Sequence, residues 1–115
     1  MVDGQVYFLL APDVRRVKIG RSIDIRRRLI EIRLLSPVML ELIGVVPGGS
    51  AVETMYHQRW SHLRQHGEWF QATDELLDHL HADNIVAAWN RARQEARDLA
   101  MSMIDEPVFD RTRCG

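Results

Sequence analysis

Cysteine and long apolar runs are both scarce in this chain of 115 residues. The single cysteine, Cys114, is next to the last residue, so no disulfide can form within the chain; this favours a reducing compartment or indifference to redox conditions. Near the N-terminus, the apolar run at residues 6–11 is too short and wrongly flanked for a signal peptide or a membrane span. We therefore expect a cytoplasmic protein that does not bind membranes.

Familiar metal and nucleotide motifs are lacking as well. The five histidines do not have a zinc-ligand spacing, and the sequence contains neither a cysteine pair nor an HExxH motif. His79 and His81 are two residues apart on an expected helix, so they point in different directions, which favours surface positions. Residues 47–49 (PGG) predict a turn and not a phosphate-binding loop.

Lysine is nearly absent, since Lys18 is the only one beside fourteen arginines. The net charge of −1 argues against a protein that coats nucleic acid through bulk charge. Residues 15–33, however, carry eight basic and two acidic side chains, against seven basic and fourteen acidic in the rest of the chain. This concentration favours one polyanion-binding site. The alternative is a solvated basic helix balanced by acidic neighbours.

The apolar share of 46% and the charged share of 27% predict one soluble domain with a single core. The pattern indicates the α/β (α+β) class. Strands are expected at residues 5–10, 16–19 and 39–46, with a short extended piece at 68–70. Helices are expected at about residues 24–34, 50–66, 74–81 and 85–103.

The first two strands are joined by five residues and predict an antiparallel hairpin. Side chains alternate along a strand, so one face of the hairpin is expected to join the core. Its members are Val6, Phe8, Leu10, Val17 and Ile19. Tyr7 and Lys18 then lie on the opposite, polar face and can converge there. For Tyr7 alone, a packing role as a strand aromatic is the alternative.

The residues after the hairpin make this polar face suitable for a phosphodiester. Arginine stabilises charge on phosphate oxygens, and lysine or tyrosine can transfer a proton to or from water. Gly20 would let a phosphate backbone come close. Glu53 has two interpretations. With Ser50 it fits a capping box, whereas a partly sheltered carboxylate beside His57 and Arg64 could hold a hard divalent cation.

The C-terminal part of the sequence predicts helices and a tail. Gly67 is expected to cap the helix at 50–66. The helix at 85–103 carries an apolar stripe that should pack on the domain's own sheet; packing on a partner or on a second copy is the alternative. The members of the stripe are Ile85, Trp89, Ala92, Ala96 and Leu99. The tail at 105–115 contains Pro107 and is expected to be loose.

Several of these residues occur in a characteristic order along the chain: Tyr7, Lys18, Ile19, Gly20, Asp24, Arg28 and Glu53. This order and spacing resembles the GIY-YIG nuclease superfamily. The VYF run at 6–8, Ser36-Pro37, the pair Glu53 and His57, and the GEWF run at 67–70 resemble its phage-type branch, often described as a DNA-binding domain. The resemblance covers about residues 5–80 and implies a three-stranded sheet flanked by helices.

The resemblance also implies roles for individual residues. Tyr7 matches a general base or proton relay, Gly20 the glycine of the second motif, and Arg28 the arginine that stabilises the scissile phosphate. Glu53 matches the glutamate that binds Mg²⁺ or Mn²⁺. His57 and Glu68 belong to the pattern of the branch. The arginines expected to bind further phosphates are Arg16, Arg21 and Arg27.

Two features depart from the superfamily pattern. Lys18 stands where the tyrosine of the second motif is expected, a change that the phage-type branch shares. The asparagine that many relatives carry after the glutamate has no counterpart, because the only asparagines are Asn84 and Asn90.

The leading hypothesis is a metal-dependent endonuclease that hydrolyses DNA; the alternative is a non-catalytic DNA-binding module of the same fold. We expect a nuclease-like domain at 1–82 with a helix at 83–104 packed on it. For so small a chain we expect weak sequence preference, homo-oligomerisation or a targeting partner, and the sequence does not choose among these.

Overall fold

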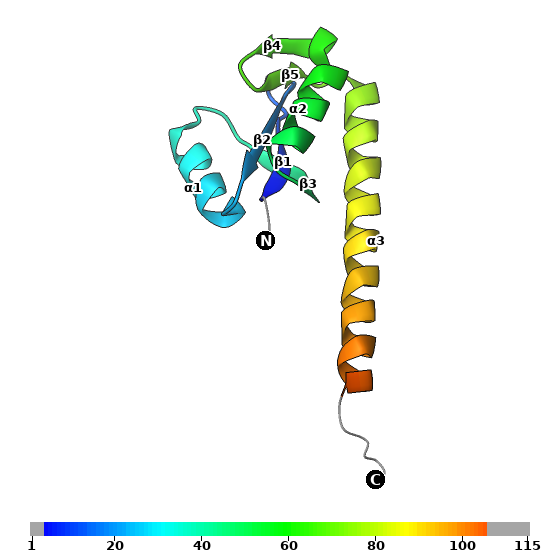
Figure 1. Ribbon diagram of the computed structural model, residues 1–115. Helices are drawn as coiled ribbons and strands as arrows, with labels where there is room; N and C mark the ends of the chain where they lie inside the picture. Colours follow the sequence, from blue (N-terminus) through cyan, green and yellow to red (C-terminus); the bar gives the residue numbers. More distant parts are fainter. Residues whose placement is uncertain (1–3, 106–115) are drawn as a thin grey trace.

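A computed structural model of the chain describes residues 4–105, with side chains placed up to residue 102 (Figure 1). The mixed α+β class is confirmed: the described residues form a five-stranded antiparallel sheet in the order β3-β1-β2-β5-β4, together with three α-helices. The strands are β1 Gln5–Ala11, β2 Arg16–Ser22, β3 Glu41–Pro47, β4 Arg64–His66 and β5 Trp69–Gln71. The helices are α1 Ile25–Leu35, α2 Ser50–Arg59 and α3 Asp74–Asp105, with a 3-10 turn η1 at Ser61–Leu63.

The predicted hairpin is confirmed. In the antiparallel pairing of β1 with β2, Tyr7 is opposite Gly20, Phe8 opposite Ile19 and Leu10 opposite Val17. The other edge of β1 pairs with β3. The expected three strands therefore form the β3-β1-β2 part of the sheet, and β5 and β4 extend it to five.

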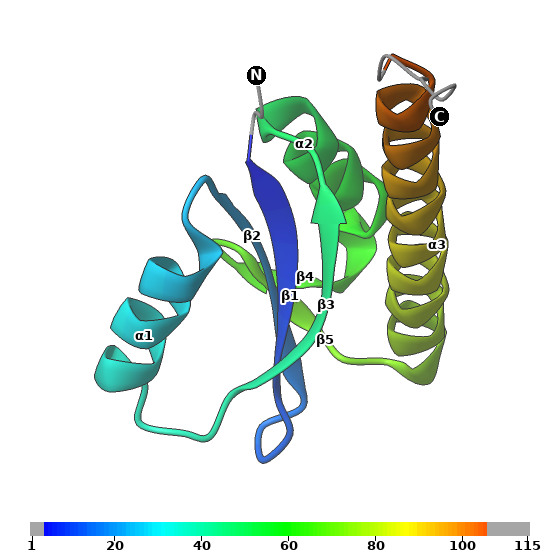
Figure 2. The same cartoon turned by 90° about the horizontal axis from the view of Figure 1, so that it is seen from below.

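The sheet has helices on both faces (Figure 2). One face packs under α2 and the start of α3, and the core between them includes Val6, Phe8, Val17, Ile19, Tyr56, Trp60, Phe70, Leu76 and Leu80. The other face packs under α1 with Tyr7, Leu9, Ala11, Leu29 and Leu40. The prediction that the second face of the hairpin is polar was therefore wrong. Because residues 6–11 of β1 are apolar at every position, both faces of this strand are buried.

The α1 helix begins as predicted. Asp24 is its N-cap, and the Asp24 side chain accepts a hydrogen bond of 3.2 Å from the backbone N–H of Arg27. The helix expected at 50–66 was predicted too long. It ends at Arg59, and residues 64–66 form β4 instead, because pairing with β5 overrides the local helical pattern. Gly67 lies in the β4–β5 turn with φ 55° and caps no helix.

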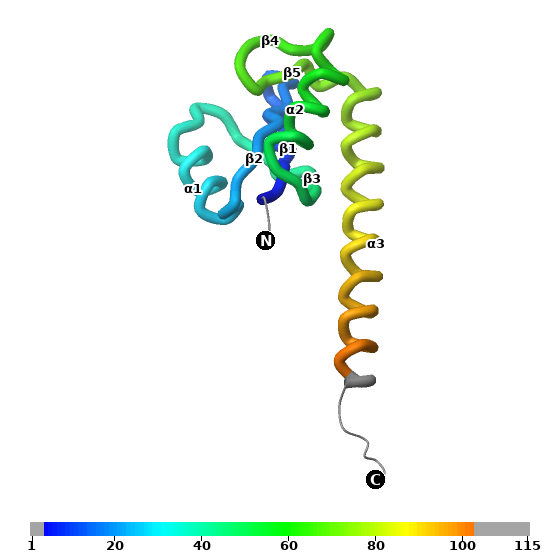
Figure 3. Tube along the Cα trace, in the orientation of Figure 1, coloured from blue at the N-terminus to red at the C-terminus, as the bar shows by residue number. Residues whose placement is uncertain are grey.

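The two predicted C-terminal helices form one helix of 32 residues. Residues 82–84 contain neither glycine nor proline, so nothing interrupts the turn-to-turn hydrogen bonds. Only the first part of α3 packs on the sheet, through Leu76 and Leu80, which are 0% and 1% exposed. The rest extends past the body of the domain, and the described chain measures 62 × 28 × 22 Å (Figure 3).

The apolar stripe of α3 does not pack on the sheet as expected. Ile85, Trp89 and Leu99 are 53%, 60% and 64% exposed. Within residues 4–105, none of the helices is both long and apolar enough to cross a membrane. Cys114 and the tail expected to be loose lie outside the described residues, apart from Asp105 at the end of α3.

Candidate active site

Among residues 4–105, no strand pairs with the outer edge of the second half of β2. The pairing of β2 with β5 involves residues 16–18, where Lys18 is opposite Trp69. Beyond it, the Ile19 backbone N–H donates a hydrogen bond of 3.0 Å to the Glu68 carbonyl. The Ile19 carbonyl accepts one of 2.8 Å from His57 Nε2, so this nitrogen carries a proton. His57 of α2 and the turn before β5 are thereby held against the edge of β2, where side chains from both faces of the sheet can meet.

Gly20 lies where these side chains converge. A Cβ atom built on Gly20 would be 2.6 Å from the Tyr7 hydroxyl oxygen and 2.9 Å from Glu68 Oε1. The glycine is therefore required for a close approach and not for a special backbone angle. The sequence suggested that this space admits a phosphate; in the structure, Tyr7 and Glu68 occupy it.

A Gly20→Ala substitution should destabilise the protein by about 1–3 kcal/mol, the usual cost of inserting a methyl group into a packed region. Tyr7 is 1% exposed and cannot move aside without disturbing the core under α1. Urea unfolding measures this cost. Gly67→Asn is the matched control, because open space surrounds Gly67 and asparagine tolerates its positive φ. An unchanged free energy of unfolding for Gly20→Ala would mean that Tyr7 and Glu68 shift freely.

Tyr7 and Arg28 interact across the α1 face of the sheet. Burial raises the pKa of Tyr7 above its ordinary value, and a hydrogen bond between its hydroxyl and the Arg28 side chain opposes that rise. The hydroxyl is therefore protonated at neutral pH, so Tyr7 can donate a proton but is not present as a phenolate. The Arg28 side chain is 47% exposed and also lies 3.4 Å from the Glu31 carboxylate, so it faces solvent beside Tyr7.

The only lysine of the chain is paired with a carboxylate. Lys18 Nζ lies 2.9 Å from Glu68 Oε1, and the Lys18 side chain is 13% exposed. Its ammonium group also lies 5.7 Å from the centre of the Trp69 ring, within the range of a cation–π contact. Lys18 thus holds Glu68 beside Tyr7.

Glu53 lies in the first turn of α2, and the capping-box interpretation of this residue was wrong. The N-cap is Gly49 and not Ser50, and no side chain of residues 4–102 makes a capping hydrogen bond there. Glu53 Oε1 is 3.7 Å from Arg21 Nε, whereas Glu53 Oε2 is buried without a hydrogen-bond partner among the described residues. Burial, and next the negative charge of Glu68, raise the pKa of Glu53. Two carboxylates therefore lie close enough together for the charge of Glu68 to disfavour ionisation of Glu53.

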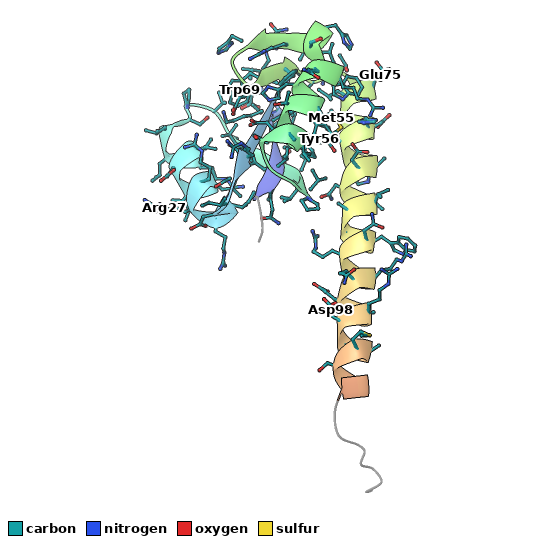
Figure 4. All side chains as sticks on the ribbon, viewed as in Figure 1. Arg27, Met55, Tyr56, Trp69, Glu75 and Asp98 are labelled. Carbon is teal, nitrogen blue, oxygen red and sulfur yellow. The ribbon has the colours of Figure 1, made fainter. Side chains whose placement is uncertain are left out.

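The three arginines expected to bind further phosphates are not all at this site. Arg21 lies beside Glu53. Arg16 Nη1 donates a hydrogen bond of 2.9 Å to the Val14 carbonyl in the hairpin turn. Arg27 lies on the outer side of α1 (Figure 4), 79% exposed and 3.4 Å from the Glu31 carboxylate. The structure therefore brings Arg21 to Glu53 and leaves Arg16 and Arg27 outside the cluster around Gly20.

A family model matches residues 4–90, three quarters of the chain and every element that contributes to the site. The chain belongs to the T5orf172 domain family. This is a phage-associated domain of the GIY-YIG/HNH-like endonuclease type, while the GIY-YIG family model itself does not match. Neither a curated protein nor a solved structure matches the chain.

One residue of the T5orf172 domain that lines the site was not expected there. The sequence predicted only that Trp69 lies in a short extended piece at 68–70. It is half-buried against the α1 face of the sheet (Figure 4) and borders a groove that also contains Lys18 and Arg28. The available signal was its place directly after Glu68, on the strand that pairs with Lys18.

Proposed function

We propose that this T5orf172 domain is a metal-dependent endonuclease that hydrolyses DNA phosphodiester bonds. One observation carries the proposal: functional groups from β1, β2, α1, α2 and the β4–β5 turn converge at the open edge of β2. Tyr7 and Glu68 meet at Gly20, Lys18 and Glu53 lie beside Glu68, and Arg28 lies beside Tyr7. A buried phenol, a guanidinium and a carboxylate pair serve proton transfer, charge neutralisation and cation binding.

Glu53 fits a hard divalent cation such as Mg²⁺ or Mn²⁺. Its buried Oε2 atom accepts no hydrogen bond from the described residues, and Glu68 provides a second carboxylate nearby. Mg²⁺ usually binds through one or two carboxylates, with waters and substrate phosphate completing its shell. When bound, such an ion supplies Lewis-acid stabilisation and makes a coordinated water more acidic.

The protein's own side chains would divide the remaining work. Arg28, half exposed beside Tyr7, would bind the non-bridging phosphate oxygens and neutralise the charge that builds on them. The Tyr7 hydroxyl would accept a proton from the attacking water as it passes its own proton toward Glu68, whose Oε1 lies over the same glycine. Lys18 would position Glu68 through their 2.9 Å ion pair.

A supercoiled-plasmid assay tests the proposed function. The purified protein should convert the plasmid to nicked or linear forms with Mg²⁺ or Mn²⁺ and should leave it supercoiled in EDTA, because Glu53 would then have no cation to bind. A gel-shift measurement on the same DNA is the companion readout. A protein that shifts DNA but never cuts it across several divalent metals is a binding module, and the endonuclease proposal fails.

A further inference from the structure

A groove opens directly beside the proposed catalytic cluster, between α1 and the start of β5. It has a volume of about 310 Å³, at the lower end of the range for small-molecule sites. Its lining includes Lys18, Arg28, Ile32, Leu35, Pro37 and Trp69. Because Lys18 and Arg28 belong to both the groove and the cluster, whatever fills the groove is a neighbour of the scissile phosphate.

The lining of the groove combines two kinds of side chain. Arg28 and Lys18 supply cationic groups, and each is also paired with a carboxylate, Glu31 and Glu68 respectively. The rest of the lining is largely apolar. The half-buried Trp69, which lies 5.7 Å from Lys18 Nζ, forms part of this apolar lining, and so does Leu35, which is 86% exposed. A ligand that matches it has an anionic end followed by a flat apolar part.

A nucleotide has this composition. Its base is joined to its phosphate through a single sugar, so a phosphate held by Arg28 leaves the attached base within reach of the groove. The flat face of a base stacks on aromatic side chains whatever its sequence, and its polar edge can hydrogen-bond to a carboxylate such as Glu31, which also lines the groove. The cationic residues therefore match a phosphate, and the apolar walls match a base.

We infer that the groove binds one unpaired base adjacent to the phosphate that is cut, so that the substrate is single-stranded DNA or DNA with an unpaired nucleotide. In a regular duplex both faces of a base are covered by its neighbours and its edge is paired, so the base cannot also enter a protein groove. This inference rests on the proposed function, because it takes Arg28 as the residue that binds the scissile phosphate.

Equilibrium binding in EDTA tests the inference without any cleavage. The probes are a fluorescent oligodeoxythymidine, a chain of the same length made of abasic deoxyribose phosphates, and a duplex. Wild-type protein should prefer the oligodeoxythymidine to the abasic chain. Trp69→Ala should weaken binding of the oligodeoxythymidine about tenfold, the size of one lost base–aromatic stack, and should leave the abasic chain and the duplex unaffected.

Two further variants keep the test independent of folding. Leu35→Ser changes a side chain that is 86% exposed and should lower oligodeoxythymidine binding in the same selective way. Trp89→Ala is the control, because Trp89 is an exposed tryptophan on α3, away from the groove. The inference is overturned if the wild type shows no preference for bases, or if Trp69→Ala and Leu35→Ser leave binding unchanged or weaken all probes equally. Equal weakening of all three probes would also fit a groove that receives a protein side chain.

The plasmid assay separates this inference from the proposed function. Base-dependent binding through Trp69 without any nicking would support the base-binding inference and contradict the proposed endonuclease function. Metal-dependent nicking together with base-independent binding would support the endonuclease and overturn the groove inference.

Discussion

Glu53→Gln should reduce metal-dependent plasmid cleavage by more than about a hundredfold, because changes to outer-shell residues alone already cost 10- to 100-fold in metal sites. Glutamine has the shape of glutamate but lacks the charge that attracts a divalent cation. Glu53 Oε2 is buried without a hydrogen-bond partner among the described residues, so it is the oxygen proposed to bind the metal. The substitution removes the negative charge from this carboxylate. Cleavage is followed over a Mn²⁺ titration, with Mn²⁺ binding measured by calorimetry.

The same substitution should leave the fold intact. Burial and the charge of Glu68 raise the pKa of Glu53, so the ionised carboxylate is less stable in the folded chain than in the unfolded chain. Removing it should keep or raise the unfolding temperature measured without metal. Glu75→Gln, at an exposed position in the first turn of α3, is the matched control and should retain full cleavage. If Glu53→Gln still cuts DNA at the wild-type rate, the metal assignment is wrong.

Arg28→Ala should lower the cleavage rate about 100- to 1,000-fold, the effect expected from removing one donor that stabilises transition-state charge. Arg28→Lys should recover only part of this loss, because an ammonium group does not reproduce the planar donor pair of guanidinium. Single-turnover cleavage at saturating DNA measures the chemical step. The Tyr7 hydroxyl also loses the neighbouring guanidinium that lowers its pKa, which adds to the effect.

Arg33→Ala provides the control for Arg28 on the same helix. Arg33 is exposed in the last turn of α1 and is not one of the candidate site residues. Its removal should leave the rate at saturating DNA near the wild-type value, since α1 keeps its N-cap and its buried Leu29. Equal losses for Arg28→Ala and Arg33→Ala would indicate a general charge effect and would contradict a specific role for Arg28.

The local parts of the fold were predictable because neighbouring residues determine them. The hairpin follows from two short apolar runs around a proline-containing turn, and α1 follows from Asp24 before a helical pattern. The approach of Tyr7 to Gly20 was also implicit, because alternation along paired strands places both on one face. The order of Tyr7, Gly20, Arg28 and Glu53 predicted the family type because a family motif is a pattern along the chain.

The errors concern interactions between segments that are distant in the sequence. Residues 64–66 leave the expected helix because they pair with β5, and no local pattern encodes that partner. The face of the hairpin that carries Tyr7 was predicted to be polar, but Leu29 of α1 covers it. This cover depends on how α1 docks on the sheet, which the local sequence does not specify. The apolar stripe at Ile85, Trp89 and Leu99 was expected to be buried, yet α3 continues straight past the edge of the domain.

By itself, the sequence determined the α+β class, the hairpin, the N-cap of α1 and the residue types of the candidate site, since these depend on side-chain chemistry and short-range spacing. Only the tertiary structure decided which groups meet. It paired Lys18 with Glu68, left Glu53 Oε2 buried without a partner among the described residues and lined a groove with Trp69. The physical reason is that β5 stops pairing with β2 at Lys18, which opens the strand edge where both faces of the sheet contribute side chains.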